Sequence, residues 1–121
     1  MVEVASTGVD GFALQNGTPT ILSWTAPSTG GLRTAQVSGY LDVTSQETGG
    51  TLLVVLKNPG STQLLDAIFI SGGGTAPGVY WPNGADVVFP LAVLPGYSVE
   101  LVQSSPLTAG AATVFAQIFA S

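Results

Sequence analysis

The side chains able to carry acid–base or metal chemistry in this 121-residue sequence are few, and most are carboxylates. Seven Asp and Glu residues stand against two cations, Arg33 and Lys57, and there is no His and no Cys. A serine nucleophile would have only Lys57 or a carboxylate as its base, and disulfides and thiolate metal sites are excluded. No phosphate-binding loop, dinucleotide fingerprint or G-x-S-x-G motif occurs. We therefore expect no enzyme activity and no cofactor.

The carboxylates are also spread along the chain. They are Glu3, Asp10, Asp42, Glu47, Asp66, Asp86 and Glu100. No two are closer than four positions, so there is no local calcium loop with ligands at alternate positions. Two alternatives stay open, in which distant carboxylates converge in the fold either to bind Ca²⁺ or to act as an acid/base pair.

Charge excludes some partners and favours another. The formal net charge of −5, with two cations, excludes nucleic acids and anionic membrane surfaces, which are bound through clustered Lys and Arg. Charged residues make up 7 % of the chain, against roughly 25 % in a typical soluble domain. So little charge indicates that much of the surface meets another protein. The alternative is a monomer with a surface rich in Ser and Thr.

Apolar residues fall in short runs with the composition and alternation of β-strands. We expect strands at 20–26, in two pieces within 32–44 around Gly39, and at 51–56, 64–71, 87–94, 97–103 and 113–120, with turns at 45–50 and 57–60. Leu22 and Trp24 share a face, which places Trp24 in the core. No long window shows helical periodicity. The pattern predicts an all-β protein, a sandwich or a barrel of about eight to ten short strands.

The domain organisation is simple. Residues 21–121 are expected to form a single domain. Residues 1–20 are expected to be short edge strands or an arm that docks on a neighbour, with Val2, Val4, Phe12 and Leu14 as its apolar side chains.

The last run, 113–120, says most about assembly. One face would carry Val114, Ala116, Ile118 and Ala120, and the other Thr113, Phe115, Gln117 and Phe119. An antiparallel strand with one solvent-exposed face should alternate apolar and polar residues, but this strand has apolar residues on both faces. One face would be covered by the domain's own core and the other by a second subunit. We expect the interface with that subunit to include Val114, Phe115, Gln117, Ile118 and Phe119, together with Leu101.

Three segments resemble the tumour necrosis factor and complement globular-head superfamily of trimeric jelly rolls. The first is the strand 38–43 (SGYLDV), the second is 87–102 with Leu91, Gly96, Val99 and Leu101, and the third is 114–120. The resemblance covers residues 20–121. It implies that residues 21–121 form an antiparallel jelly-roll β-sandwich and that the protein is a homotrimer with the last strand near its axis. The chain departs from the family where Gly96-Tyr97 replaces Gly-Asp and where Ala116 and Gln117 replace the closing Gly. Short cysteine-free members of this kind are similar to bacteriophage head decoration or head-fibre proteins.

A Gly-rich loop at 72–84 carries the best candidates for recognition. Tyr80, Trp81 and Asn83 are aromatic or amide side chains able to stack on a sugar or anchor a protein partner. The alternative is a loop folded back so that Trp81 caps the core. Asp42 and Asp66, within apolar strands, are either polar contacts at a subunit interface or solvated edge residues.

These observations favour a non-enzymatic structural protein. The expected function is a homotrimeric decoration or cementing protein of a phage capsid, located in the virion and assembled in the host cytoplasm, whose partner is a larger shell such as the major capsid protein. The alternative is a fibre-tip or lectin-like module that binds a glycan or receptor through the 72–84 loop.

Overall fold

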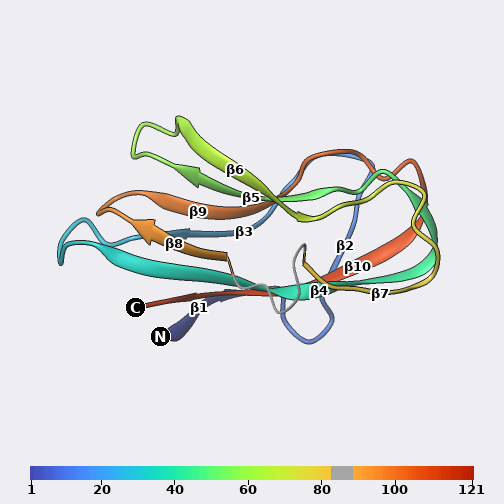
Figure 1. Ribbon diagram of the computed structural model, residues 1–121, viewed down its shortest axis with the longest axis horizontal. Helices are drawn as coiled ribbons and strands as arrows, with labels where there is room; N and C mark the ends of the chain where they lie inside the picture. Colours follow the sequence, from blue (N-terminus) through green and yellow to red (C-terminus); the bar gives the residue numbers. More distant parts are fainter. Residues whose placement is uncertain (83–88) are drawn as a thin grey trace.

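The computed structural model describes residues 1–82 and 89–121 and contains two antiparallel sheets packed face to face (Figure 1). The strands are β1 (Val2–Ser6), β2 (Phe12–Ala13), β3 (Thr20–Thr25), β4 (Arg33–Thr48), β5 (Leu52–Lys57), β6 (Gln63–Ile70), β7 (Gly78–Tyr80), β8 (Phe89–Val93), β9 (Ser98–Gln103) and β10 (Ala109–Ala120). The described residues include no helix. The predicted all-β sandwich is therefore confirmed.

The first sheet, sheet A, has the order β1-β10-β4-β7, with β2 also paired to β10 and β8 also paired to β4. The second, sheet B, has the order β3-β9-β5-β6. The chain passes from one sheet to the other between β2 and β3, β3 and β4, β4 and β5, β6 and β7, β8 and β9, and β9 and β10. These repeated crossings between two antiparallel sheets are the connectivity of a jelly roll.

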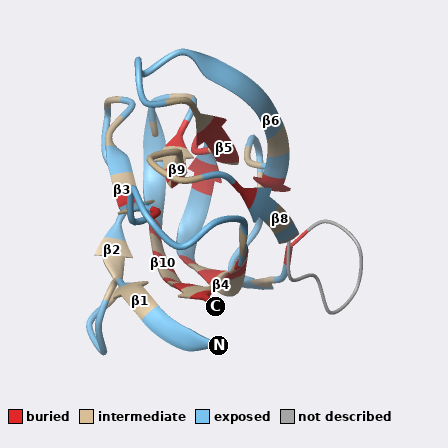
Figure 2. Ribbon diagram, turned by 90° about the vertical axis from the view of Figure 1, so that its left-hand side faces the viewer, coloured by how far each residue is buried: buried red, intermediate tan, exposed pale blue. Residues whose placement is uncertain are grey.

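The core lies between the sheets because each strand turns one row of aliphatic side chains inward. Phe69, Leu41, Leu52, Leu101 and Ile118 are among its largest fully buried members. Figure 2 shows buried segments on the strands of both sheets, while β6 and the start of β1 are largely exposed. Trp24 is half-buried and packs against this core, on the same side of β3 as Leu22, as predicted.

The strand β4 is longer than the sequence indicates. The turn expected at 45–50 is wrong at its start, because β4 continues to Thr48. The partners of this extension come from distant segments: Thr48 pairs with Ala109, and Glu47 forms a bridge with Thr75. Local preference favours a turn at the polar residues 45–48. Long-range backbone hydrogen bonds hold these residues in an extended strand instead. The two pieces expected around Gly39 are likewise one strand.

The N-terminal residues belong to sheet A. β1 pairs with β10 from Val2–Ala120 to Ser6–Gln117, and β2 pairs with β10 at Phe12–Val114. Leu14 is 7 % exposed and lies in the core. Residues 1–14 thus form the border of the sandwich beside the last strand.

Candidate functional site

The two faces of the last strand, β10, differ clearly in burial. Val114, Ala116 and Ile118 point into the sandwich and are fully buried, while Phe115 and Gln117 point outward and are half-buried. The outer face of sheet A therefore presents an aromatic and amide row that no other part of the described chain covers fully.

The predicted trimer-interface residues fall into two groups. Leu101, Val114 and Ile118 are 0 % exposed in the domain's own core, so their side chains offer no surface to another subunit. Their assignment to an interface is wrong, because sheet B packs onto this face of β10. Phe115, Gln117 and Phe119 lie on the outer face, half-buried, and these three keep the assignment as a prediction.

The outer face of sheet A carries three aromatic side chains in a row across its strands. The Phe115 ring on β10 stacks on the Tyr40 ring on β4, with centroids 5.2 Å apart and planes at 22°. The Trp81 ring, just after β7, lies 5.3 Å from the Tyr40 ring and is tilted by 49°. Trp81 is 65 % exposed. We call Phe115, Tyr40 and Trp81 the aromatic row.

Neighbouring residues Tyr80 and Trp81 point to opposite sides of the sheet. Tyr80 pairs with Leu41, packs against the core, and donates its hydroxyl proton to the Ala76 carbonyl at 2.7 Å. Tyr80 is therefore a structural residue, and its assignment to a binding loop is not supported by its position. Trp81 lies on the outer face, so the alternative in which it caps the core is wrong. Asn83 lies outside the described residues.

Beside the aromatic row the outer face is hollowed into a groove of about 500 Å³. One side of it is made by side chains of β4 and β10, and the other by β1 and the loop that follows. The lining residues are Glu3, Ser6, Gly8, Val9, Tyr40, Phe115 and Gln117. Val9, in that loop, is 95 % exposed. The groove is thus lined by two aromatic rings (Tyr40 and Phe115), an exposed aliphatic side chain (Val9) and a carboxylate (Glu3).

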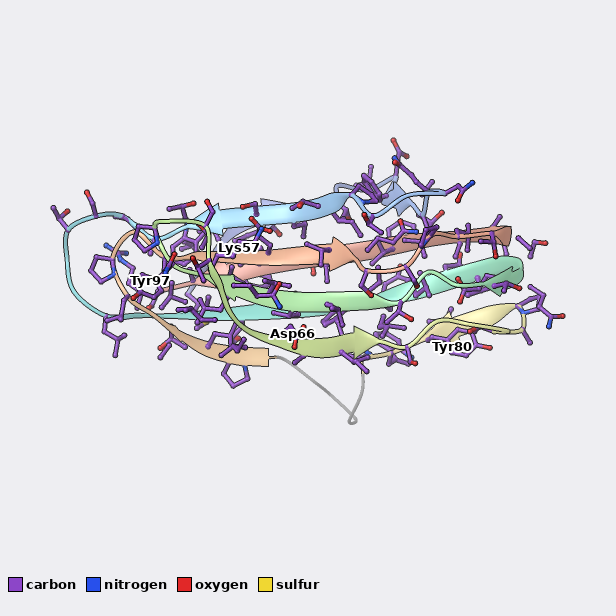
Figure 3. All side chains as sticks on the ribbon, turned by 90° about the horizontal axis from the view of Figure 1, so that it is seen from above. Lys57, Asp66, Tyr80 and Tyr97 are labelled. Atoms are coloured by element: carbon purple, nitrogen blue, oxygen red, sulfur yellow. The ribbon has the colours of Figure 1, made fainter. Side chains whose placement is uncertain are left out.

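Both cations of the protein are engaged away from this face. Lys57 forms an ion pair with Glu100 on sheet B, with Nζ and Oε1 2.9 Å apart, and Arg33 donates to the Ser121 carbonyl at 3.0 Å. Figure 3 shows Lys57 and Tyr97 toward one end of the sandwich and Tyr80 toward the other, with Asp66 between them. The outer face of sheet A therefore has acidic residues, Glu3 and Asp42, and no cation among the residues described.

The carboxylates of the described residues form no metal-binding cluster, and Asp86 lies outside those residues. Within the described part of the chain no group of three or more Asp and Glu residues is placed to hold a metal ion. Asp66 is exposed on β6 and accepts from the Gln63 amide at 3.1 Å, whereas Asp42 lies half-buried on β4 in the other sheet. The two residues therefore share no site.

One carboxylate that the sequence places in a turn is buried. Glu47 is 0 % exposed, and its Oε1 accepts a hydrogen bond from the Gly73 amide at 3.3 Å. Its Oε2 has no hydrogen-bond partner among the described residues. Gly50 leaves the space it needs, since a Cβ there would lie 2.5 Å from Oε2. Glu47 thus ties the end of β4 to the Gly-rich loop.

The predicted docking residues of the N-terminal segment are mostly covered. Leu14 is in the core, Val4 and Phe12 are half-buried against it, and Val2 is 67 % exposed. Only Val2 among the four offers most of its side chain to a partner.

Sequence reasoning missed two residues of this face, Tyr40 and Val9. The alternation of 40–44 signals that Tyr40 faces away from Leu41, but its aromatic neighbours come from segments about forty and seventy-five residues away. Val9 follows no strand pattern, so its place beside the groove depends on the loop after β1.

No protein-family model, no curated protein and no solved structure matches this chain. Among the described residues no helix has the length and apolarity to cross a membrane.

Proposed function

We propose that this protein is a non-enzymatic structural subunit that assembles as a homotrimer and decorates a larger protein shell, a phage capsid. The observation that carries the proposal is the outer face of sheet A. There Trp81 and Val9 are exposed, and the half-buried Tyr40 and Phe115 rings line the groove together with polar side chains. Exposed apolar side chains rimmed by polar residues are typical of protein interaction sites.

The energetics favour assembly through this face. Phe, Tyr and Trp each bury about 150–250 Å² when covered, and aromatic residues dominate the energy of protein interfaces. At about 25 cal/mol per Å², an obligate interface of roughly 2,000 Å² has a gross apolar term of tens of kcal/mol. Association and ordering costs remove much of that term. The aromatic row, in which Trp81 is mostly exposed and Tyr40 and Phe115 are half-buried, supplies part of that area.

Composition and resemblance supply the rest of the proposal. Charged residues are only 7 % of the chain, and no metal-binding cluster or catalytic arrangement is present among the described residues. The resemblance of 38–43, 87–102 and 114–120 to trimeric jelly rolls supports three copies, and the similarity to phage head proteins supports the virion as its location. The remaining exposed surface, including Val2 and the aliphatic residues of β6, would then meet the shell.

The solution mass of the full chain tests the assembly. Light scattering at micromolar concentration should give the mass of three chains, because an obligate contact of this size dissociates only far below that concentration. A monomer at that concentration would remove the proposal. Co-sedimentation with purified shells that lack the protein then tests decoration, with saturation at a fixed ratio as the expected result.

A second function is favoured by one observation, the exposed Trp81 beside a groove that contains a carboxylate and an amide. Sugars are bound by aromatic stacking and by side chains of this kind. In this alternative the protein is a fibre-tip or lectin-like module. Glycan binding that is lost in Trp81→Ala while the oligomer persists would select it, and an empty glycan array would exclude it.

A further inference from the structure

We infer that the ligand of the groove is a sugar that carries a free amino group, with its ammonium paired to Glu3. The inference rests on the lectin-like alternative proposed above and assigns the chemical class of its ligand. The groove has a volume of about 500 Å³, within the roughly 300–1,000 Å³ of typical small-molecule sites. It is therefore large enough to hold a sugar ring.

The aromatic rings of this face provide a surface on which a sugar ring packs. Tyr40 and Phe115 line the groove and stack on each other with centroids 5.2 Å apart. Trp81 lies 5.3 Å from Tyr40 and is 65 % exposed, so the aromatic surface continues beyond the groove. The C–H groups of a pyranose ring pack on such rings, whose faces carry partial negative charge. The extended aromatic surface favours an oligosaccharide over a single sugar.

Two neutral polar side chains of the groove have donors left for hydroxyl groups. The Oε1 atom of Gln117 accepts from the Ser38 hydroxyl at 3.4 Å, which leaves the amide N–H groups of Gln117 to donate. The Oγ atom of Ser6 accepts from the Gly8 amide at 2.9 Å, which leaves the hydroxyl proton of Ser6 to donate. The side chain of a lysine has no oxygen to accept from these donors. An amino sugar has both hydroxyl groups and an ammonium, so it matches the groove better than a basic peptide does.

The charge of this face selects the ionic group of the ligand. Glu3 lines the groove, is exposed, and forms no ion pair within the described part of the chain. Asp42 lies half-buried on the same face, two residues from Tyr40, while the cations Lys57 and Arg33 are engaged elsewhere. Carboxylates without a nearby cation repel sialic acids, uronic acids and sulfated sugars, whereas a carboxylate forms strong hydrogen bonds with an ammonium. The complementary sugar is therefore one whose amino group is free and protonated.

Two matched sugars test the inference when each is titrated into the full chain and binding is followed by NMR or calorimetry. The probes are an oligomer of glucosamine and the same oligomer with every amine acetylated, at slightly acidic pH where the free amine is protonated. The free-amine oligomer should bind about threefold to fivefold more tightly, the effect of an ion pair at an exposed site, and added salt should reduce the difference. Glu3→Gln keeps the shape of the side chain and should abolish the difference. Asp66→Asn removes the same charge from sheet B and should leave the difference unchanged.

The outcomes separate the inference from the function on which it rests. Equal affinity for the two oligomers, a difference that survives Glu3→Gln, or binding of acidic glycans instead would overturn the inference and leave the lectin-like alternative standing. Binding of Nα-acetyl-lysine amide as tight as that of the glucosamine oligomer would also overturn it, because the groove would then recognise an ammonium without a sugar. Failure to bind any glycan would remove the lectin-like alternative itself. Light scattering should give the same mass for wild type and both variants, so that a change in affinity is not a change in assembly.

Discussion

Gly39 lies where the two central strands of sheet A, β4 and β10, approach each other closely, and replacing it with Ala should be a damaging single-methyl change. Gly39 pairs with Ala116 in β10 and has a φ of +147°. A Cβ at this position would overlap the carbonyl oxygen of Phe115 and lie 2.7 Å from the Cα of Ala116. Since these are backbone atoms of a central strand, no side-chain rotation relieves the overlap.

The expected loss has two parts. A non-glycine residue in a sparsely populated backbone region costs about 1–3 kcal/mol. Inserting a methyl group where there is no space costs about 1–3 kcal/mol more. We expect Gly39→Ala to lower the free energy of unfolding by about 2–6 kcal/mol, a large share of the roughly 5–15 kcal/mol that a domain has. The change should also weaken assembly, because β4 must move away from β10 and separate Tyr40 from Phe115.

Gly78 provides a matched control. Its φ is +149°, nearly that of Gly39, but the nearest atom to an added Cβ is a Tyr80 ring carbon at 3.8 Å, an ordinary contact. Gly78→Ala therefore carries the backbone cost alone, about 1–3 kcal/mol. Urea unfolding followed by tryptophan fluorescence, at one fixed protein concentration, measures both variants. Equal losses for Gly39→Ala and Gly78→Ala would show that the contact with β10 does not constrain this position, and would refute the reasoning.

Three further substitutions test other parts of the structure. Leu101→Ala should cost about 2–5 kcal/mol in urea unfolding, since the side chain is in the core, and the difference from wild type should be the same at low and high protein concentration; a loss that appears only on dilution would place Leu101 at a subunit contact. Lys57→Met should lower the free energy of unfolding by about 1–3 kcal/mol, because it leaves the largely buried Glu100 carboxylate unpaired. Adding Glu100→Gln should restore part of that free energy in a double-mutant cycle, and full additivity of the two changes would argue against the ion pair. Arg33→Met should remove the hydrogen bond to the Ser121 carbonyl, costing about 0.5–1.5 kcal/mol, and hydrogen exchange at the Ser121 amide should accelerate; unchanged exchange would mean that Arg33 does not hold the end of the chain.

Alternation predicted the faces of individual strands well, because a strand's side chains point to opposite sides whatever it pairs with. Leu41 and Val43 are inside and Tyr40 is outside, as the pattern of 40–44 indicates. The strand limits were less predictable. The polar residues 45–48 are extended because β10 supplies their hydrogen bonds, a partner more than sixty residues away.

The candidate site was predicted only in part. The sequence identified Phe115, Gln117 and Trp81 as residues of an interface or a binding loop, but it did not distinguish them from Leu101, Val114 and Tyr80, which the structure places in or against the core. Both faces of β10 are apolar, so composition does not say which one sheet B covers. Which face of β10 stays exposed depends on which face sheet B covers.

What the sequence determines by itself is the class of the protein and the chemistry it lacks. Period-two apolar runs broken by Gly and Pro favour strands, and a chain without Cys has no thiolate site. What the tertiary structure decided is the surface. Phe115, Tyr40 and Trp81 form a row because β10, β4 and β7 are neighbours in sheet A, and that order is set by backbone hydrogen bonds between distant segments. Local preferences do not specify those pairings, because their free energy comes from contacts that exist only once both sheets have formed.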